Sequence, residues 1–293
     1  MSPAGRFAPS PSADLHIGNL RTAVLAWLFA RSTGRRFLVR VEDLDDRTFS
    51  DIGQRQVDDL AAIGLTWDEP VAWQTGHRDR YDTVIAQLAA DGLLYECYCS
   101  RKDIAQAPQA PHAPLGAYPG TCRELTADER AARRAETARP PALRLRTDTF
   151  TGTVTDLIHG PYTGIVDDFV VRRGDGVPAY NLAVVVDDAD SGVDQVVRGD
   201  DLLSSSPRQA YLARLLGYPE PTYAHVPLVL NAGGARLAKR DGAVSLGEIG
   251  VERALAQICA SLGWPAGTVD DMLAWFDPAQ LPRRPWIFSS GSA

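Results

Sequence analysis

Lysine is almost missing from this sequence of 293 residues. Lys102 and Lys239 are its only lysines, and the other basic residues among its 30 are all arginines, so each lysine is a candidate for a specific role. Long apolar runs are missing too. The longest one near the N-terminus covers residues 23–30, whereas about 20 residues are needed to cross a bilayer. The opening residues do not resemble a secretory signal. We therefore expect a cytoplasmic protein without membrane contact.

The sequence also lacks an excess of positive charge. Its net charge is −7 and its pI is near 5.3, which disfavours a broad, non-specific surface for nucleic acid. A local basic surface remains open at residues 123–146, where seven arginines accompany four acidic residues. The alternative for that segment is a solvated helix of mixed charge. We expect a monomer.

Hydrophobic periodicity predicts an α/β fold. Residues 37–41 have a strand pattern, and residues 19–31 place apolar side chains on one helical side. With a first strand near Phe7, they make a strand–helix–strand unit, which implies a parallel sheet, and we expect this sheet to be doubly wound. The other predictions are helices over 51–63 and 81–92, strands over 165–171 and 182–188, and a helix that Ser206 caps and that ends near residue 216. The run over 182–188 is continuously apolar before its two aspartates, as in a strand buried on both faces.

A change of composition divides the chain. Cysteines, a proline-rich run and the arginine-rich run follow one another between residues 95 and 147, which indicates an insertion rather than a continuation of the sheet. We expect residues 1–94 and 148–241 to be the two halves of one main domain. Residues 95–147 would be the inserted subdomain, and residues 242–293 a short helical C-terminal part.

Three of the four cysteines lie close together in the sequence. Cys97, Cys99 and Cys122 fall within 26 residues, and without secretory features such a group favours a metal site over disulfide bonds. Three thiolates suit a structural zinc site, which needs four ligands. From the residues alone, His112 is the candidate for the fourth ligand. Three buried free thiols are the alternative.

A second group of residues has the pattern of a phosphate site. Near His16 the chain enters a helix, and the amides and positive end of a helix favour phosphate. Gly18 lets a ligand approach the backbone, while His16 and Asn19 can hydrogen-bond to one of its oxygens. A simple capping role for His16 is the alternative.

Five sequence blocks, in one order, resemble the class I aminoacyl-tRNA synthetases in the form that is specific for glutamate. They are residues 6–19, with R-F-A-P-S-P and the H-I-G-N counterpart of the HIGH signature, R-V-E-D-L-D at 40–45, P-A-Y-N-L-A-V-V-V-D-D at 178–188, V-R-G-D-D-L-L at 197–203, and R-L-A-K-R at 236–240, where the family has its KMSKS loop. The resemblance implies a Rossmann-like catalytic domain that activates glutamate with ATP.

The resemblance further implies a glutamate pocket. Glutamate carries two carboxylates and one ammonium group, and a guanidinium fits a carboxylate with two parallel hydrogen bonds. Arg6 and Arg198 would hold the side-chain carboxylate, and Glu42 would bind the ammonium group. The other expected lining residues are Phe7, Ala8, Pro9, Ser10 and Tyr180.

Ordinary ion pairs are the alternative explanation for these charges. Glu42 and Asp43 would then form salt bridges at a strand end, and Arg198 would pair with Asp187 or Asp188. Such pairs explain the presence of the charges but not their order along the chain.

Lys239 is the expected cation of the ATP site. When a carboxylate attacks the α-phosphate of ATP, negative charge on the phosphoryl oxygens must be stabilised, and a mobile ammonium group does this. The resemblance implies that His16, Gly18, Asn19 and Lys239 bind ATP with its Mg²⁺. His16, Asn19 and Lys239 would be catalytic, with Arg236 as a helper. Asn19 and Arg236 depart from the family pattern, and a surface lysine in a glycine-rich loop is the alternative for Lys239.

The resemblance also bears on the cysteines and on the acceptor. A small group of glutamyl-synthetase paralogues has Cys-x-Cys followed by Tyr-x3-Cys, in which the tyrosine oxygen is the fourth zinc ligand, so Tyr118 is implied rather than His112. Only 53 residues follow Arg240, too few for the anticodon-binding region of a full-length enzyme. The chain therefore resembles the shortened glutamyl-Q tRNA(Asp) synthetases.

That narrower resemblance implies activation of glutamate without tRNA and its transfer to the queuosine base in the anticodon of tRNA(Asp). The zinc subdomain and the arginine-rich segment would face the RNA. Two alternatives remain: a glutamate ligase that uses another acceptor, and a non-catalytic paralogue that binds tRNA or amino acid.

Overall fold

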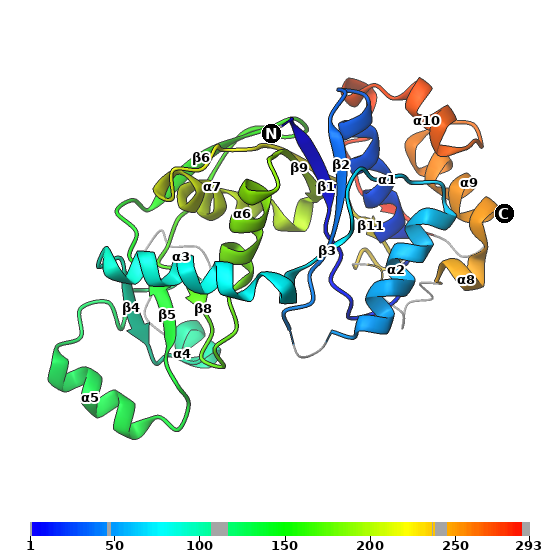
Figure 1. Ribbon diagram of the computed structural model, residues 1–293. Coiled ribbons are helices and arrows are strands. Elements are labelled where there is room, and N and C mark those ends of the chain that lie inside the picture. Colours follow the sequence, from blue (N-terminus) through cyan, green and yellow to red (C-terminus); the bar gives the residue numbers. More distant parts are fainter. Residues whose placement is uncertain (1, 46–47, 107–116, 236, 238–244, 289–293) are drawn as a thin grey trace.

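The computed structural model describes residues 2–45, 48–106, 117–235, 237 and 245–288. A seven-stranded sheet in the order β3-β2-β1-β9-β10-β6-β7 forms the centre of these residues (Figure 1). All its neighbouring strands are parallel except the hairpin of β6 and β7. The strands are β1 (Ala4–Phe7), β2 (Arg36–Val41), β3 (Ala72–Trp73), β6 (Thr151–Asp156), β7 (Gly160–Ile165), β9 (Val193–Gly199) and β10 (Thr222–Val226).

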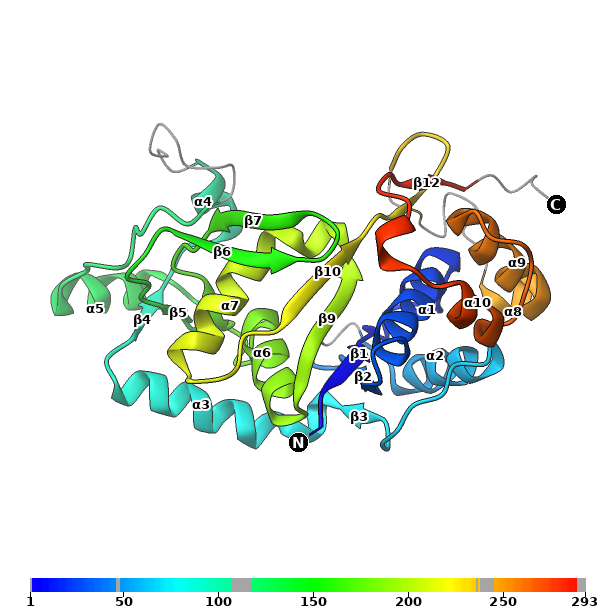
Figure 2. The same cartoon turned by 90° about the horizontal axis from the view of Figure 1, so that it is seen from above.

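Helices cover both faces of this sheet (Figures 1 and 2). On one face α1 packs on β1 and β9, and α9 and α10 pack on α1; on the other, α6 packs on β9, α7 packs on β6, and α3 packs on α6. The predicted doubly wound α/β fold is therefore confirmed. The helices are α1 (Ile17–Arg31), α2 (Ser50–Ala62), α3 (Arg78–Ala90), α6 (Tyr180–Asp190), α7 (Ser206–Leu215), α8 (Leu246–Ile249), α9 (Val251–Leu262) and α10 (Val269–Trp275).

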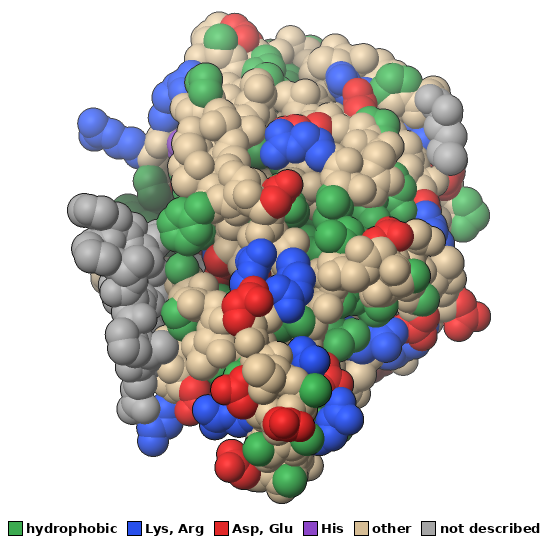
Figure 3. All heavy atoms as spheres, turned by 90° about the vertical axis from the view of Figure 1, so that its left-hand side faces the viewer, with side chains coloured by type: hydrophobic (Ala, Val, Ile, Leu, Met, Phe, Trp, Pro, Cys, Tyr) green, Lys and Arg blue, Asp and Glu red, His purple; other side chains and the backbone are tan. Residues whose placement is uncertain are grey.

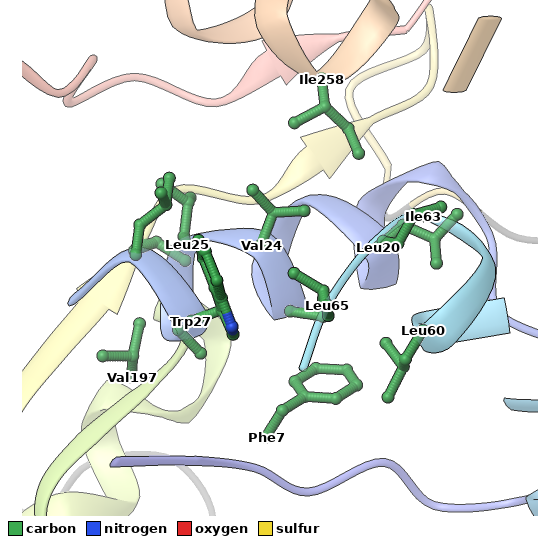
Figure 4. Packing of buried hydrophobic residues seen from close by; sticks show 14 of the residues in the cluster. Phe7, Leu20, Val24, Leu25, Trp27, Leu60, Ile63, Leu65, Val197 and Ile258 are labelled. Carbon is green, nitrogen blue, oxygen red and sulfur yellow. The ribbon is translucent and has the colours of Figure 1, made fainter. Parts of the chain in front are cut away.

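The main core surrounds α1, which is buried along most of its length. Figure 4 shows Leu20 and Val24 of α1 between Leu60 of α2 and Ile258 of α9, with Phe7 of β1 below them. Each large apolar side chain buried in this way contributes roughly 1.5–3 kcal/mol. This packing fixes the N-terminal end of α1 against the carboxyl ends of β1 and β9.

The prediction of a strand over 182–188 is wrong, because these residues lie within α6. A short, continuously apolar run does not distinguish a buried strand from a buried helix by periodicity. Here the helix lies between the sheet and α3, so that its valines are buried on several sides. The change from strand to helix places Asp187 and Asp188, both buried, against the polar face of the sheet.

The strand predicted over 165–171 is interrupted. β7 ends at Ile165 and β8 (Val170–Arg172) belongs to a separate antiparallel sheet, β4-β5-β8. Asp167 and Asp168 lie between them. The Asp167 carboxylate accepts a hydrogen bond from the backbone N–H of Tyr118 over 2.7 Å, and that of Asp168 accepts one from Tyr95 Oη over 2.7 Å. These bonds join the small sheet to the segment that contains the cysteines.

The small sheet lies at one end of the molecule, beside α5 (Figure 1). Its other strands are β4 (Leu94–Cys97) and β5 (Ala142–Leu145), and the segment between them contains α4 (Arg101–Gln106) and α5 (Ala127–Glu136). A further pair of parallel strands, β11 (Val229–Leu230) and β12 (Trp286–Ile287), joins the end of the chain to the segment after β10. None of the helices in the described ranges combines the length and apolar character that crossing a membrane requires.

Candidate active site

Three arginines share one face of the sheet near the carboxyl ends of its strands. Arg6 of β1 lies opposite Leu38 of β2 and Val196 of β9. Arg40 and Arg198 follow these two residues at a distance of two positions, so all three arginines point to the same face. Their side chains are buried. The carboxyl edge of an open parallel sheet is where ligands usually bind.

Asp188 of α6 neutralises two of these arginines. Its carboxylate accepts hydrogen bonds from Arg6 Nε over 3.1 Å and from Arg40 Nη1 over 2.6 Å. Burial raises the pKa of Asp188, but the charges of Arg6 and Arg40 outweigh burial and hold that pKa below its usual value. Asp187, its neighbour, lies 3.5 Å from Arg40 Nε. Arg6 and Arg40, rather than Arg198, therefore pair with these aspartates.

Neutral groups hold the third arginine, Arg198. Its Nε donates to His225 Nε2 over 3.0 Å, its Nη2 to Ser206 Oγ over 2.8 Å, and its Nη1 to Tyr180 Oη over 3.2 Å. Within the described part of the chain, no carboxylate forms an ion pair with it. Ser206 was expected to cap α7, but it is the first residue of that helix and makes no capping bond there.

Ser10, Glu42 and Tyr180 line a cleft of about 1040 Å³, whereas Arg6, Arg40 and Arg198 lie behind these residues and are not part of its lining. Arg40 Nη2 donates to Glu42 Oε1 over 3.4 Å. Burial raises the pKa of the Glu42 carboxyl above its usual value, although the charges of Arg40 and Arg6 act in the opposite direction. A cationic group bound in the cleft beside Glu42 would compensate for this burial.

Two other residues expected to line the pocket, Phe7 and Pro9, do not line the cleft. Phe7 points to the opposite face of the sheet, into the core around α1. The carbonyl of Pro9 accepts a hydrogen bond from the N–H of Glu42 over 2.9 Å. Asp43 accepts bonds from the N–H and hydroxyl of Thr75 over 2.9 Å and 2.6 Å. The backbone after β1 thus sets the position of Glu42, while Asp43 forms no salt bridge among the described residues.

His16, Gly18 and Asn19 form the N-terminal end of α1. His16 Nδ1 accepts hydrogen bonds from the N–H groups of Gly18 and Asn19 over 3.1 Å and 3.4 Å, and Asn19 Oδ1 accepts one from the N–H of His16 over 3.2 Å. A Cβ atom on Gly18 would lie only 3.0 Å from the His16 ring and 3.2 Å from Val229. His16 therefore caps α1. The two hydrogen bonds to its Nδ1 hold the imidazole ring against the first turn of the helix.

Most of the KMSKS-like segment lies outside the described residues. Arg236 and Lys239 are both in that part, so their roles stay predictions. Ser245, the first described residue after 238–244, forms an antiparallel bridge with His16. Ser245 therefore lies at the N-terminal end of α1, where the phosphate site is expected.

The three predicted metal-binding cysteines come together. The Sγ atoms of Cys97, Cys99 and Cys122 lie within 4.8 Å of one another, and those of Cys99 and Cys122 are 3.6 Å apart. Tyr118 Oη lies 3.5 Å from Cys97 Sγ. A tetrahedral zinc ion with Zn–S bonds of about 2.3 Å places its sulfurs about 3.8 Å apart and an oxygen ligand about 3.5 Å from a sulfur. The geometry therefore fits three thiolates and the Tyr118 oxygen.

One thiol of this cluster, that of Cys97, has a lowered pKa. Burial and the charge of Cys97 raise the pKa of Cys99, and the hydrogen bond with Cys97 together with burial raises that of Cys122. Hydrogen bonding from Cys122, opposed by burial and aided by the charge of Arg144, lowers the pKa of Cys97 to about 4. A thiolate is the form of cysteine that binds metal. The Arg144 guanidinium also lies over the Tyr118 ring, 3.6 Å from its centre. His112, the other candidate for a fourth ligand, lies outside the described residues.

Sequence reasoning missed the contacts that three residues make in the site. Arg40 was visible as a charged residue inside a predicted strand, which is a signal for a buried functional group. Asp188 was assigned to a strand, so its contact with β1 and β2 was not expected. His225 follows Arg198 by 27 residues and carries no local motif. Only the pairing of β9 with β10 brings it beside Arg198.

Comparisons with known proteins agree with this geometry. The model of the family described as tRNA synthetases class I (E and Q), catalytic domain, matches residues 4–275. A glutamyl-Q tRNA(Asp) synthetase of Nocardia farcinica is 62% identical over 291 residues, which cover 98% of this chain and 93% of that protein. A glutamate–tRNA ligase of Acidithiobacillus ferrooxidans is 39% identical over 94% of this chain, but only 61% of its own length is covered.

Solved structures show the same relationship. The glutamate–tRNA synthetase of Elizabethkingia anophelis superposes with a TM-score of 0.81 at 25% identity, covering 99% of this chain and 68% of that one. The chain therefore spans nearly all of the Nocardia protein and about two thirds of the longer synthetases.

Proposed function

Since the chain belongs to the class I tRNA synthetases for glutamate and glutamine and is an ATP-dependent ligase, we propose that it activates glutamate without tRNA and transfers it to queuosine in the anticodon of tRNA(Asp). The observation that carries this proposal is the set of buried guanidiniums beside the Glu42 carboxylate. This set complements an amino acid with an acidic side chain. We also propose a cytoplasmic location, since tRNA is the substrate.

In the proposed complex, the cleft binds glutamate by its charges. Arg198 Nη1, which reaches Tyr180 at the cleft wall, would donate to the side-chain carboxylate together with Arg6. Glu42 would accept from the α-ammonium group. A guanidinium held in place before the ligand arrives loses little entropy on binding, and the contacts of Arg6 and Arg198 support such preorganisation.

ATP would bind beside glutamate at the N-terminal end of α1. The helix end and its N–H groups attract phosphate, and a side chain larger than that of Gly18 would crowd His16 and Val229 there. An oxygen of the glutamate α-carboxylate would attack the α-phosphorus, and the bond from that phosphorus to pyrophosphate would break. His16, Asn19 and Lys239 would stabilise the negative charge on the phosphoryl oxygens. Mg²⁺ bound to the ATP would neutralise further charge on its phosphates.

In the second step, a hydroxyl of the modified base would attack the carbonyl carbon of the mixed anhydride, and AMP would leave. The name and the nearly complete coverage of the Nocardia relative support queuosine as the acceptor. The test is the transfer of labelled glutamate to two preparations of tRNA(Asp), one with queuosine and one with guanosine at that position. Transfer only to the modified tRNA supports the proposal. Equal transfer to both, or transfer to neither while another acceptor is labelled, contradicts it.

We further propose that Cys97, Cys99, Tyr118 and Cys122 bind one structural zinc ion. The sulfur–sulfur and sulfur–oxygen distances support this set of ligands. The metal would stabilise the junction between β4 and the segment before α5, where few apolar side chains are buried. Metal analysis of the purified protein tests this proposal, with about one zinc ion per chain as the expected result.

A further inference from the structure

A fully buried pair of residues lies behind Arg198. His225 Nδ1 is 2.6 Å from Asp156 Oδ2, and neither residue is exposed. Asp156 ends β6 and also accepts hydrogen bonds from the N–H groups of Ile158, His159 and His225. Each of these groups can only donate to it, so the position of the carboxylate is fixed by backbone.

The contacts of His225 determine where its proton lies. A guanidinium has donors and no acceptor, so the bond from Arg198 Nε requires a lone pair on His225 Nε2. The ring proton is therefore on Nδ1, where it is donated to Asp156. His225 is thus a neutral imidazole with one defined tautomer, and Asp156 selects that tautomer.

This arrangement connects Arg198 to the cleft through Tyr180, although Arg198 itself does not line the cleft. Its Nε and Nη2 are occupied by His225 and Ser206, and its Nη1 reaches Tyr180, which lines the cleft. A carboxylate in the place of His225 would accept the same bond but would also neutralise the arginine. A neutral imidazole orients Arg198 and leaves its positive charge available to a ligand.

The contrast with Arg6 and Arg40 supports this reading. Both of those guanidiniums are paired with Asp188. Arg198 is only 6% exposed, and among the residues that the structure describes it has no ion-pair partner. Leaving a charge buried without a partner is costly. An anionic ligand group would relieve this cost, whereas a neutral amide would not.

We propose that Asp156, His225 and Ser206 are positioning residues that orient Arg198 and keep its charge unneutralised, and that this makes the site select glutamate over glutamine. The inference rests on the proposed function, because it takes Arg198 to bind the side chain of the substrate. The specificity would come from a fixed cation that only a carboxylate side chain can pair with.

The test is amino-acid-dependent ATP–pyrophosphate exchange with glutamate and with glutamine. His225→Leu removes the acceptor while keeping an apolar side chain of similar size. We expect it to raise the KM for glutamate about tenfold or more, since one charged hydrogen bond is lost, and to leave the KM for ATP unchanged. The preference for glutamate over glutamine in kcat/KM should fall by a similar factor.

Two variants separate positioning from a general structural effect. His225→Gln offers an amide whose oxygen can accept from Arg198 and whose nitrogen can donate to Asp156, so we expect it to restore most of the glutamate affinity and preference. His159→Gln is the matched control, because within the described ranges the His159 side chain hydrogen-bonds to the backbone carbonyl of His225, over 3.1 Å, and not to Arg198. We expect that variant to behave as the wild type.

A third variant keeps the test decisive if His225→Leu does not fold. Ser206→Ala removes one acceptor of Arg198 at the start of α7, and we expect the KM for glutamate to rise about threefold, the effect of one weaker hydrogen bond. Unchanged KM and selectivity in Ser206→Ala and His225→Leu would overturn the inference. So would equal increases in the KM values for glutamate and ATP. Exchange by the wild type serves as the control for the proposed function. If the wild type shows no exchange with glutamate, the proposed function fails, and this result differs from an unchanged KM in the variants.

Discussion

Replacing Asp188 by asparagine tests the buried charges that support the site. Asp188 is the shared partner of Arg6 and Arg40, and its side chain is 10% exposed while those of the two arginines are 4% exposed. Asparagine keeps the shape and one acceptor oxygen, but it removes the negative charge. Arg40 would keep its ion pairs with Glu42 and Asp187, whereas Arg6 would keep none among the described residues.

The expected cost is large because an unpaired buried charge cannot be solvated. Removing one partner of a buried ion pair typically costs about 3–5 kcal/mol of folding free energy. Asp190→Asn is the matched control on the same helix. Asp190 pairs with Arg80 at the surface, where the two side chains are 41% and 40% exposed, so its loss should cost about 1 kcal/mol or less.

Urea unfolding followed by circular dichroism measures both changes under one set of conditions. We expect a much lower midpoint for Asp188→Asn than for Asp190→Asn, with similar slopes. Asp188→Asn should also raise the KM for glutamate, because Arg6 loses its partner. If the two variants lost equal stability, the idea that Asp188 compensates two buried charges would be refuted.

Further predictions concern the metal, the pH and the RNA. Tyr118→Phe should lower the bound zinc, measured by elemental analysis after dialysis against a weak chelator; full retention would exclude the tyrosine oxygen as a ligand. Burial lowers the pKa of His225 more than Asp156 raises it. As the pH falls, the His225 imidazole is therefore protonated in the unfolded chain before it is protonated in the folded protein. The free energy of unfolding should then decrease below about pH 6.5, by at most about 1.4 kcal/mol per pH unit. Urea unfolding near neutral and mildly acidic pH should show a smaller loss for His225→Gln, and an equal loss would contradict this assignment. Reversing the charges of Arg133 and Arg134 should weaken tRNA binding and flatten its dependence on salt; unchanged transfer kinetics would count against an RNA-facing role.

The surface around α5 bears on the expected contact of Arg133 and Arg134 with tRNA. In Figure 3, basic and acidic side chains are mixed over this side of the molecule, with no continuous basic surface. Arg134 pairs with Glu96 over 2.5 Å, while Arg133 lies 3.8 Å from Glu136. Contact with RNA through this helix would therefore require these surface pairs to open, which costs little.

Local patterns predicted three helices and one strand of the fold. The helices over 19–31, 51–63 and 81–92 and the strand over 37–41 correspond to α1, α2, α3 and β2 within a few residues. In α2 and α3 the apolar periodicity matches the buried face, whereas α1 is buried on nearly all sides. The run over 182–188 failed because its burial depends on α3 and on the sheet, and periodicity cannot report contacts on several sides.

The site could be predicted only where the resemblance supplied the residues. Ser10, Glu42 and Tyr180 do line one cleft. The bond from Arg6 to Asp188 joins residues separated by 182 positions, and that from His225 to Asp156 spans 69. Such pairings follow from the order of the strands and the placement of α6, which no local sequence pattern encodes.

The most direct test of the central claim is ATP–pyrophosphate exchange by the purified protein in the absence of tRNA, with each of glutamate, glutamine and aspartate. The buried guanidiniums beside Glu42 predict exchange with glutamate alone, and its loss when Arg198 is replaced by leucine. Exchange that is absent with glutamate, or equally fast with glutamine, would contradict the account.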